Sequence, residues 1–260
     1  MKIISENKKI SRRNAEILLA ALIIMRATAY MFSKILLETM GQFTLLGIRS
    51  AIAFIILLIV CFPTLRKTRK EDVICGAVLG VVIFIVMSFE LAGLTYTASV
   101  SISFEENTAV VLVPILLALF TRKIPSRKTC FGFLMSGTGI FLISFKPSGF
   151  DFNIGDVCGM MAALTYATLI ILISALSRKA DPIRVGIFQV GTLAFMSLLA
   201  AILIETPVLP SGGSEWFYML YLALICTVFG FTLQPYAQSG TTAERAGVLC
   251  ALNPVTASIL

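Results

Sequence analysis

The sequence predicts an all-α membrane protein, a polytopic bundle of nine transmembrane helices in two inverted five-helix repeats, the second of which is incomplete. Apolar residues make up 58% of the 260 residues and charged residues only 13%, whereas soluble domains carry roughly 25% charged residues. The apolar residues form runs of about 20, and a helix of that length crosses a hydrocarbon core of about 30 Å. In addition, two similar segments are separated by an odd number of such runs.

Nine runs are predicted to span the membrane. They cover 14–34, 42–62, 73–93, 98–120, 129–146, 157–176, 185–204, 216–236 and 246 to the end. The last run has only 15 residues, which at about 1.5 Å per residue is too short to cross comfortably. We therefore expect the chain to be a truncated form that lacks the end of this helix and a tenth helix.

Basic residues predict which loops face the cytoplasm. Of the 21 lysines and arginines, 17 precede the first run or follow the second, fourth, sixth and eighth: Lys2, Lys8, Lys9, Arg12, Arg13, Arg66, Lys67, Arg69, Lys70, Arg122, Lys123, Arg127, Lys128, Arg178, Lys179, Arg184 and Arg245. The opposite loops contain only Lys34 and Lys146. This predicts a multi-pass protein of the plasma (inner) membrane with a cytoplasmic amino terminus. The basic pI near 9.2 then reflects topology, so we expect lipid around the chain and no nucleic-acid partner.

The chain repeats itself. AGLTYTASVS (92–101) and AQSGTTAERAG (237–247) each precede an apolar run, and five of the predicted spans lie between them. A repeat with an odd number of spans places its second copy upside down, as in carriers that alternate access around a site near the bilayer midplane. The two repeats are predicted at 14–146 and 155–260, the second incomplete.

Ionisable residues inside the predicted spans are the candidates for function, because charge in a membrane is costly. Counting about 1.5 Å per residue from the helix starts places Arg26, Arg49, Glu105 and Glu106 in one layer a little outside the midplane. Glu90 is expected nearer the outer interface. Three interpretations remain open: a cavity wall that holds the charged ends of a small-molecule substrate, a structural ion-pair network, or a protonated glutamate at a helix interface.

The predicted substrate-binding residues are Arg26, Arg49, Glu105, Glu106, Asn107 and Gln189. Gln189 is included because it matches Arg49 by repeat position. Adjacent helical residues point about 100° apart, so one of the two neighbouring glutamates is expected at the cavity and the other at an arginine. A glutamate at this depth could also carry a proton and couple transport to the proton gradient. Pro114 and Pro235 are expected to kink their helices.

Four segments resemble a known family. The runs 96–144, 155–182, 45–58 and 252–260 are similar in order and spacing to helices of the EamA repeats in the drug/metabolite transporter superfamily. The resemblance implies ten helices in two inverted repeats and export of small metabolites or drugs across the plasma membrane. Two positions depart from the family pattern: Met25-Arg26 stands where the first helix commonly has glycine, and Lys123 where a loop glutamate is usual.

Other classes of function are disfavoured. The chain has no histidine, which excludes HExxH and Ser-His-Asp chemistry, and it has no P-loop motif. Its six cysteines show no CxxC spacing, so we expect small apolar side chains and neither a metal nor a cofactor. We expect no enzyme; a membrane-embedded enzyme using the Glu/Arg layer, a channel, and a structural or sensor protein remain as alternatives. A cleaved signal peptide ending at Ala27-Thr28-Ala29 is disfavoured by the neighbouring Arg26.

Overall fold

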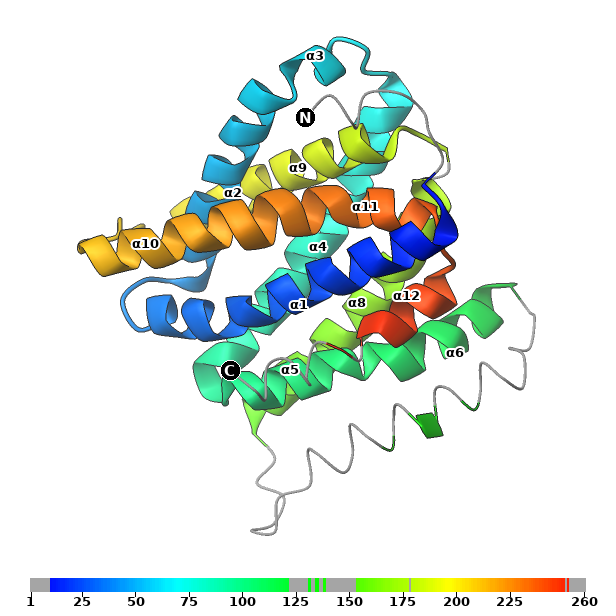
Figure 1. The fold of residues 1–260 in the computed structure, drawn as a ribbon. Coiled ribbons are helices and arrows are strands. Elements are labelled where there is room, and N and C mark those ends of the chain that lie inside the picture. Colours follow the sequence, from blue (N-terminus) through cyan, green and yellow to red (C-terminus); the bar gives the residue numbers. More distant parts are fainter. Residues whose placement is uncertain are drawn as a thin grey trace.

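The computed structural model describes residues 10–121, 131, 134–135, 138, 153–177, 179–250 and 252. Over these residues the chain is helical and has no strand (Figure 1). Its elements are α1 (Arg12–Leu37), α2 (Gln42–Val60), α3 (Phe62–Leu65), α4 (Lys70–Tyr96), α5 (Ser99–Asn107), α6 (Ala109–Thr121), α8 (Ile154–Leu176), α9 (Pro182–Ile204), α10 (Gly213–Tyr221), the π-helix η2 (Leu222–Phe231), α11 (Thr232–Ser239) and α12 (Ala243–Cys250).

Seven helical segments in the described part of the chain are long and apolar enough to cross a membrane. They confirm the predicted spans one to four and six to eight. The predicted span 129–146 falls almost entirely outside the described residues. Of the predicted ninth span only the beginning is described, where it forms part of α12.

The fourth and eighth spans are built from more than one element. The fourth breaks at Thr108, where α5 ends, and not at Pro114, which lies inside α6. The eighth runs continuously from α10 through η2 to α11 (Figure 1). Its π-helix ends at Phe231, four residues before Pro235. Proline has no N–H to donate to the carbonyl four residues back, so an irregularity at Phe231 has a local cause.

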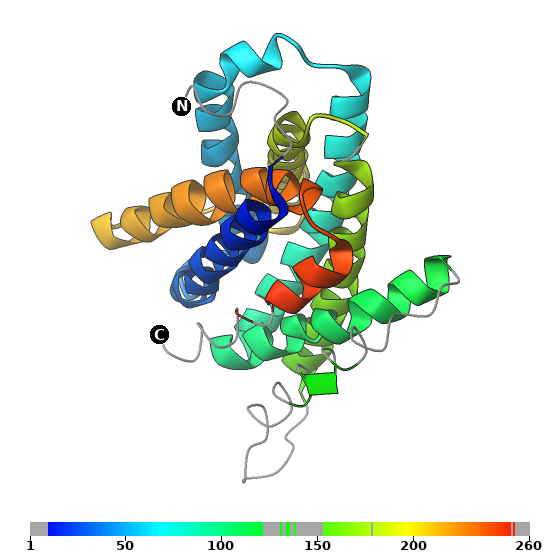
Figure 2. The ribbon, with the colours of Figure 1, turned by 45° about the vertical axis from the view of Figure 1, so that its right-hand side comes forward.

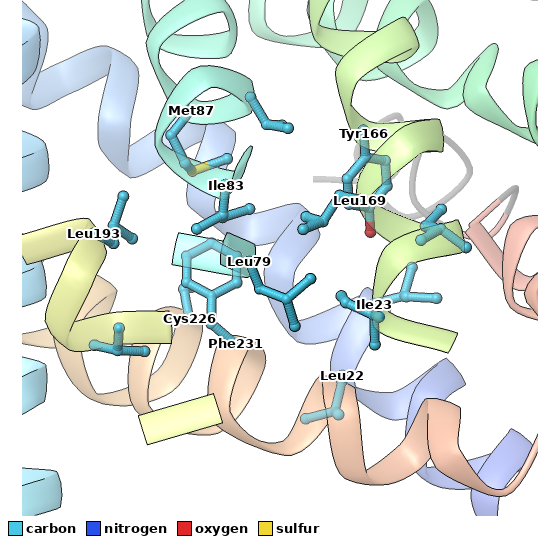
Figure 3. Packing of buried hydrophobic residues seen from close by; sticks show 14 of the residues in the cluster. Leu22, Ile23, Leu79, Ile83, Met87, Tyr166, Leu169, Leu193, Cys226 and Phe231 are labelled. Carbon is cyan, nitrogen blue, oxygen red and sulfur yellow. The ribbon is translucent and has the colours of Figure 1, made fainter. Parts of the chain in front are cut away.

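An apolar core joins the two halves of the chain. Ile83 of α4, Leu169 of α8, Leu193 of α9 and Cys226 of η2 belong to one cluster of buried side chains (Figure 3). The outer surface is apolar as well: Ile59 is 72% exposed and Leu203, like other residues on that surface, is similarly exposed. Apolar exposure on this scale is unfavourable in water but favourable against lipid.

Glycines allow the helices to pack closely. A side chain at Gly76 or Gly80 of α4 would meet α9, and one at Gly186 of α9 would meet the backbone of α11 at Thr232. Small residues at such contacts let helix backbones approach in lipid, where no hydrophobic force drives association. Helix α4 packs along both α8 and α9, and α2 packs along α9. Helix α1 lies beside the span formed by α10, η2 and α11 (Figures 1 and 2).

Polar contacts join the halves at both ends of the bundle. At one end Arg184 of α9 donates to Asp72 of α4 (2.7 Å), and Asp72 accepts the backbone N–H of Asp181 (2.9 Å). At the other end the Glu205 carboxylate accepts the backbone N–H of Phe43 (3.0 Å) and of Thr44 (2.9 Å) at the start of α2. A carboxylate there satisfies free N–H groups and complements the helix dipole.

Candidate functional site

A small cavity lies where the two halves meet. It is lined by side chains from α1, α2 and α4 of the first half and from η2 of the second: Arg26, Ala29, Tyr30, Arg49, Met87, Glu90, Cys226, Thr227 and Phe231. The free space between these side chains admits about one water molecule. In this conformation the cavity is therefore nearly closed, although its wall contains three side chains of arginine or glutamate at 8% exposure or less.

Arg26 is surrounded by partners. Its guanidinium donates to the Tyr166 hydroxyl of α8 (2.9 Å), and Nη2 lies 3.9 Å from Oε1 of Glu106. The guanidinium carbon also lies 5.2 Å from the ring centre of Tyr166 and 4.9 Å from that of Phe231. These are cation–π distances, so the charge of Arg26 is balanced by a carboxylate, a hydroxyl and two aromatic faces.

Glu106 is fixed from a second direction. Its Oε2 accepts the hydroxyl of Tyr30 at 2.7 Å. Tyr30 follows Arg26 by four residues on α1, and side chains at that spacing lie on one face of a helix. One face of α1 therefore presents both a cation and a hydroxyl to the same buried carboxylate, which is completely shielded from solvent.

Arg49 has very different surroundings. It is only 2% exposed, yet its one hydrogen bond among the described residues goes from Nη2 to the thioether sulfur of Met87 (3.0 Å). Its Nε has no partner there, and within the described part of the chain no carboxylate lies within 4.0 Å of it. A thioether is a weak acceptor, so Arg49 is a buried cation without a direct counter-charge.

Glu90 occupies a different place from the one predicted. It is 4% exposed and lines the cavity with Arg26 and Arg49, instead of reaching the outer interface. The prediction counted depth from the start of the third span. Helix α4 is 27 residues long and ends at Tyr96, so Glu90 is six residues from its end, and Arg49 is seven residues from the start of α2. Counted from the side of the membrane where α4 ends and α2 begins, Glu90 and Arg49 lie at the same depth.

Glu90 and Glu106 lie together. The side chain of Glu90 lies close enough to those of Glu106, Arg26 and Arg49 for their charges to interact. Among the described residues, Oε2 of Glu90 and Oε1 of Glu106 have no hydrogen-bond partner. Two buried carboxyl groups therefore lie near the two arginines with part of their hydrogen-bonding capacity unused.

Two of the predicted residues turn away from the cavity. The half-buried Glu105 extends toward Gly159 of α8, where the missing side chain leaves room for its carboxylate. The neighbouring glutamates point apart and Glu106 meets Arg26, but Glu105 does not line the cavity as the other glutamate was predicted to do. The Asn107 amide donates to the carbonyl of Ser103, one turn earlier in its own helix (2.5 Å).

Gln189 lies on α9 and is not among the cavity-lining residues. It is fully buried, and neither polar atom of its side-chain amide has a hydrogen-bond partner within the described ranges. Its backbone lies against Gly76 and Gly80 of α4. Of the six predicted residues, the structure therefore brings Arg26, Arg49 and Glu106 together, and places the other three elsewhere.

Most of the aromatic and uncharged residues around the cavity were not predicted from the sequence. Tyr30 could have been found from its spacing to Arg26, and Glu90 by counting from the end of its helix. Tyr166, Met87 and Phe231 carry no such signal, because apolar and aromatic residues occur throughout the spans. Over the described residues no group of three His, Cys, Asp or Glu side chains is placed to hold a metal ion.

Together these features define a polytopic helical membrane protein with a charged cavity enclosed between two halves. The sequence matches the EamA-like transporter family over residues 13–145 and 153–260. The chain belongs to this family, in agreement with the resemblance seen in the sequence and with the drug/metabolite transporter superfamily.

Individual relatives agree with this assignment. An uncharacterized transporter of Archaeoglobus fulgidus is 27% identical over 250 residues, covering 96% of this chain and 78% of the relative. The uncharacterized transporter YetK of Bacillus subtilis is 25% identical over 260 residues, covering 95% and 78%. One protein of known crystal structure has the same fold, with a TM-score of 0.74 at 17% identity over 94% of this chain and 85% of that one. Family and relatives point to a transporter without enzymatic activity.

Proposed function

We propose that the protein is a carrier that exports a small organic metabolite or drug across the plasma membrane by alternating access between two inverted repeats. The single observation that carries this proposal is the charged cavity between the halves, where Arg26, Arg49 and Glu90 are enclosed together with Cys226 and Thr227 of η2. Buried charge in a membrane protein is costly and typically marks a substrate or ion pathway.

The course of the helices supports the inverted arrangement. The end of α4 lies against the start of α8, since Gly93 packs on Gly155, while the start of α4 lies at the end of α8, since Asp72 binds the N–H of Asp181. Helices α4 and α8 are therefore antiparallel. Gly155 at the start of α8 lies against Thr97, just before α5, and Gly159 further along α8 lies against Glu105 further along α5. Hence α5 and α6 run parallel to α8.

The direction of α6 supports a fifth span in the first repeat. Because α6 runs parallel to α8, α6 ends on the side opposite to the one where α8 begins. The fifth span predicted at 129–146 agrees with this arrangement. The two segments that match the family, 13–145 and 153–260, also agree with repeats at 14–146 and 155–260.

Polar contacts at the two ends support alternating access. The Arg184–Asp72 pair joins α9 to α4 at one end, and Glu205 joins α9 to α2 at the other. Both sets of contacts are formed while the cavity is nearly closed. A carrier must open one end at a time, so these contacts are suited to being broken in turn. The basic residues of the α2–α4 loop, next to Arg184, favour the cytoplasm for the first end.

Export is tested by comparing metabolites inside and outside cells that lack or overproduce the full-length protein. We expect one small class of organic solutes to accumulate inside the deletion strain and outside the overproducing strain. An Arg49→Met variant should abolish the difference. Ile59→Ala on the lipid-facing surface serves as the matched control and should retain it. Unchanged metabolite pools in both strains would contradict the proposal.

Coupling to the proton gradient is part of the proposal, because Glu90 and Glu106 are two buried carboxyl groups close to the cavity. A carboxyl pair beside the cavity can release a proton on one side of the membrane and take it up on the other. Export by Glu90→Gln and Glu106→Gln variants should lose its dependence on external pH, whereas Glu105→Gln, one residue away and outside the cavity, should keep it. Export that follows pH unchanged in both cavity variants would eliminate coupling through this pair.

A further inference from the structure

The two arginines at the cavity are not equally paired. Arg26 has Glu106 as its direct partner at 3.9 Å, whereas among the described residues Arg49 donates a hydrogen bond only to the sulfur of Met87. Glu90 faces the same cavity, but in the described part of the chain no carboxylate oxygen lies within 4.0 Å of Arg49. Arg49 is therefore the guanidinium without a direct counter-charge there.

An unpaired buried cation is expensive unless something else balances it. From the structure we infer that Arg49 is the binding group for a carboxylate of the transported solute. This inference rests on the proposed function and adds to it the chemical class of the cargo. A guanidinium presents its donors in a planar fork that matches the two oxygens of a carboxylate, and Nε of Arg49 is free to complete such a fork.

The surroundings select the kind of anion. The titratable or charged groups that share the cavity with Arg49 are Arg26 and Tyr30 from α1, Glu90 from α4 and Cys226 from η2, and Glu106 from α5 lies behind Arg26. The two acidic side chains in this set disfavour a doubly charged phosphate. A single carboxylate brings one negative charge to Arg49 and is repelled less by these acids. The nearly closed space also requires the halves to separate before the solute enters.

The first test needs no ligand. Thermal unfolding of the purified full-length protein in detergent is compared for Arg49→Met, Arg26→Met and the unmodified chain. If Arg49 is held ready for a solute, replacing it with an apolar side chain of similar length leaves the melting temperature unchanged or raises it. Arg26→Met should lower it by several degrees. A loss of several degrees in Arg49→Met would make Arg49 a structural residue and overturn the inference.

The second test uses chemical probes at matched ionic strength. Small carboxylic acids and amino acids, the methyl esters of the same compounds, simple amines, neutral sugars and sodium chloride are compared for thermal stabilisation. Carboxylate compounds should stabilise the unmodified protein, and their esters should not. Arg49→Met should weaken the response by roughly tenfold or more in concentration, the effect of losing a charge-assisted hydrogen bond. Arg49→Lys should retain part of it.

Several outcomes would overturn the inference. These are stabilisation by esters or amines as strong as by the acids, a carboxylate response that survives in Arg49→Met, an equal response to chloride, and no response to any carboxylate. The export comparison in cells distinguishes a failure of the carboxylate assignment from a failure of the proposed carrier function. Export of an uncharged or cationic solute would remove the carboxylate assignment and leave the carrier function in place.

Discussion

Arg26 and Arg49 lie on the same cavity but differ in what surrounds them. Arg26 is held by a carboxylate, a hydroxyl and two aromatic rings, whereas the one hydrogen bond of Arg49 in the described part of the chain goes to a thioether. Both are nearly inaccessible to solvent. Burial of a charge therefore does not by itself indicate its role. A fully partnered arginine stabilises the helix bundle, whereas an arginine without such partners can bind an anionic group of a ligand.

Removing Arg26 should have the largest effect. The Arg26→Met change leaves the Glu106 carboxylate without its cation, and breaking one side of a buried pair costs about 3–5 kcal/mol. We expect a strongly lowered melting temperature in detergent and little protein in the membrane. Arg12→Met, on the solvent-exposed first turn of α1, is the control and should stay close to the unmodified protein. If both variants melt alike, Arg26 is not a structural cation.

The reverse removal should have a smaller effect. Glu106→Gln takes away the carboxylate but keeps an acceptor for the Tyr30 hydroxyl, so part of the hydrogen bonding survives. We expect a loss of about 2–4 kcal/mol, since Arg26 then lacks a counter-charge. Glu105→Gln provides the comparison on the same helix and should cost less, because Glu105 is half-buried and lies outside the cavity. Denaturant or thermal unfolding of both variants measures the difference.

The Tyr166 hydroxyl contributes a separate part of the Arg26 environment. Tyr166→Phe removes the 2.9 Å hydrogen bond but keeps the ring under the guanidinium, so we expect a loss of about 1.5–3 kcal/mol. Tyr96→Phe, at the exposed end of α4, should be nearly neutral. A neutral Tyr166→Phe variant would show that the rings and Glu106 alone are sufficient to hold Arg26.

The smallest effect is expected beside Arg49. Met87→Leu removes the sulfur that accepts from Nη2 while conserving volume, a change that usually costs less than about 1.5 kcal/mol. Stability should therefore hardly change, and solute binding should be retained. A large loss of stability in Met87→Leu would mean that the thioether satisfies Arg49 more fully than its chemistry suggests, and the contrast between the two arginines would narrow.

The sequence predicted the helices better than the site, and the reason is physical. Apolar runs, basic loops and residue counts locate spans because lipid imposes length and polarity on them. They also place charges at approximate depths, which was sufficient for Arg26, Arg49 and Glu106. Depth alone does not give the direction of a side chain. Glu105, Asn107 and Gln189 have suitable depths, but Glu105 extends toward α8, Asn107 bonds to its own helix, and Gln189 is not among the residues that line the cavity.

Partners from distant parts of the chain were also beyond prediction. Tyr166 lies 140 residues from Arg26. Phe231 contacts Arg26 from a π-helix, and the sequence predicted only a kink at Pro235, not the partner of Phe231. Glu90 was misplaced because depth was counted from the start of a helix longer than the membrane is thick. In a helix of that length, the distance to the nearer end is the better guide.

Arg49 is proposed to bind the solute and not to stabilise the helix bundle. The direct test compares export by cells that contain the Arg49→Met variant or the unmodified protein, together with the level of each protein in the membrane. We predict that the variant reaches the same level as the unmodified protein and exports nothing. Undiminished export, or a protein level that falls together with export, would contradict the account.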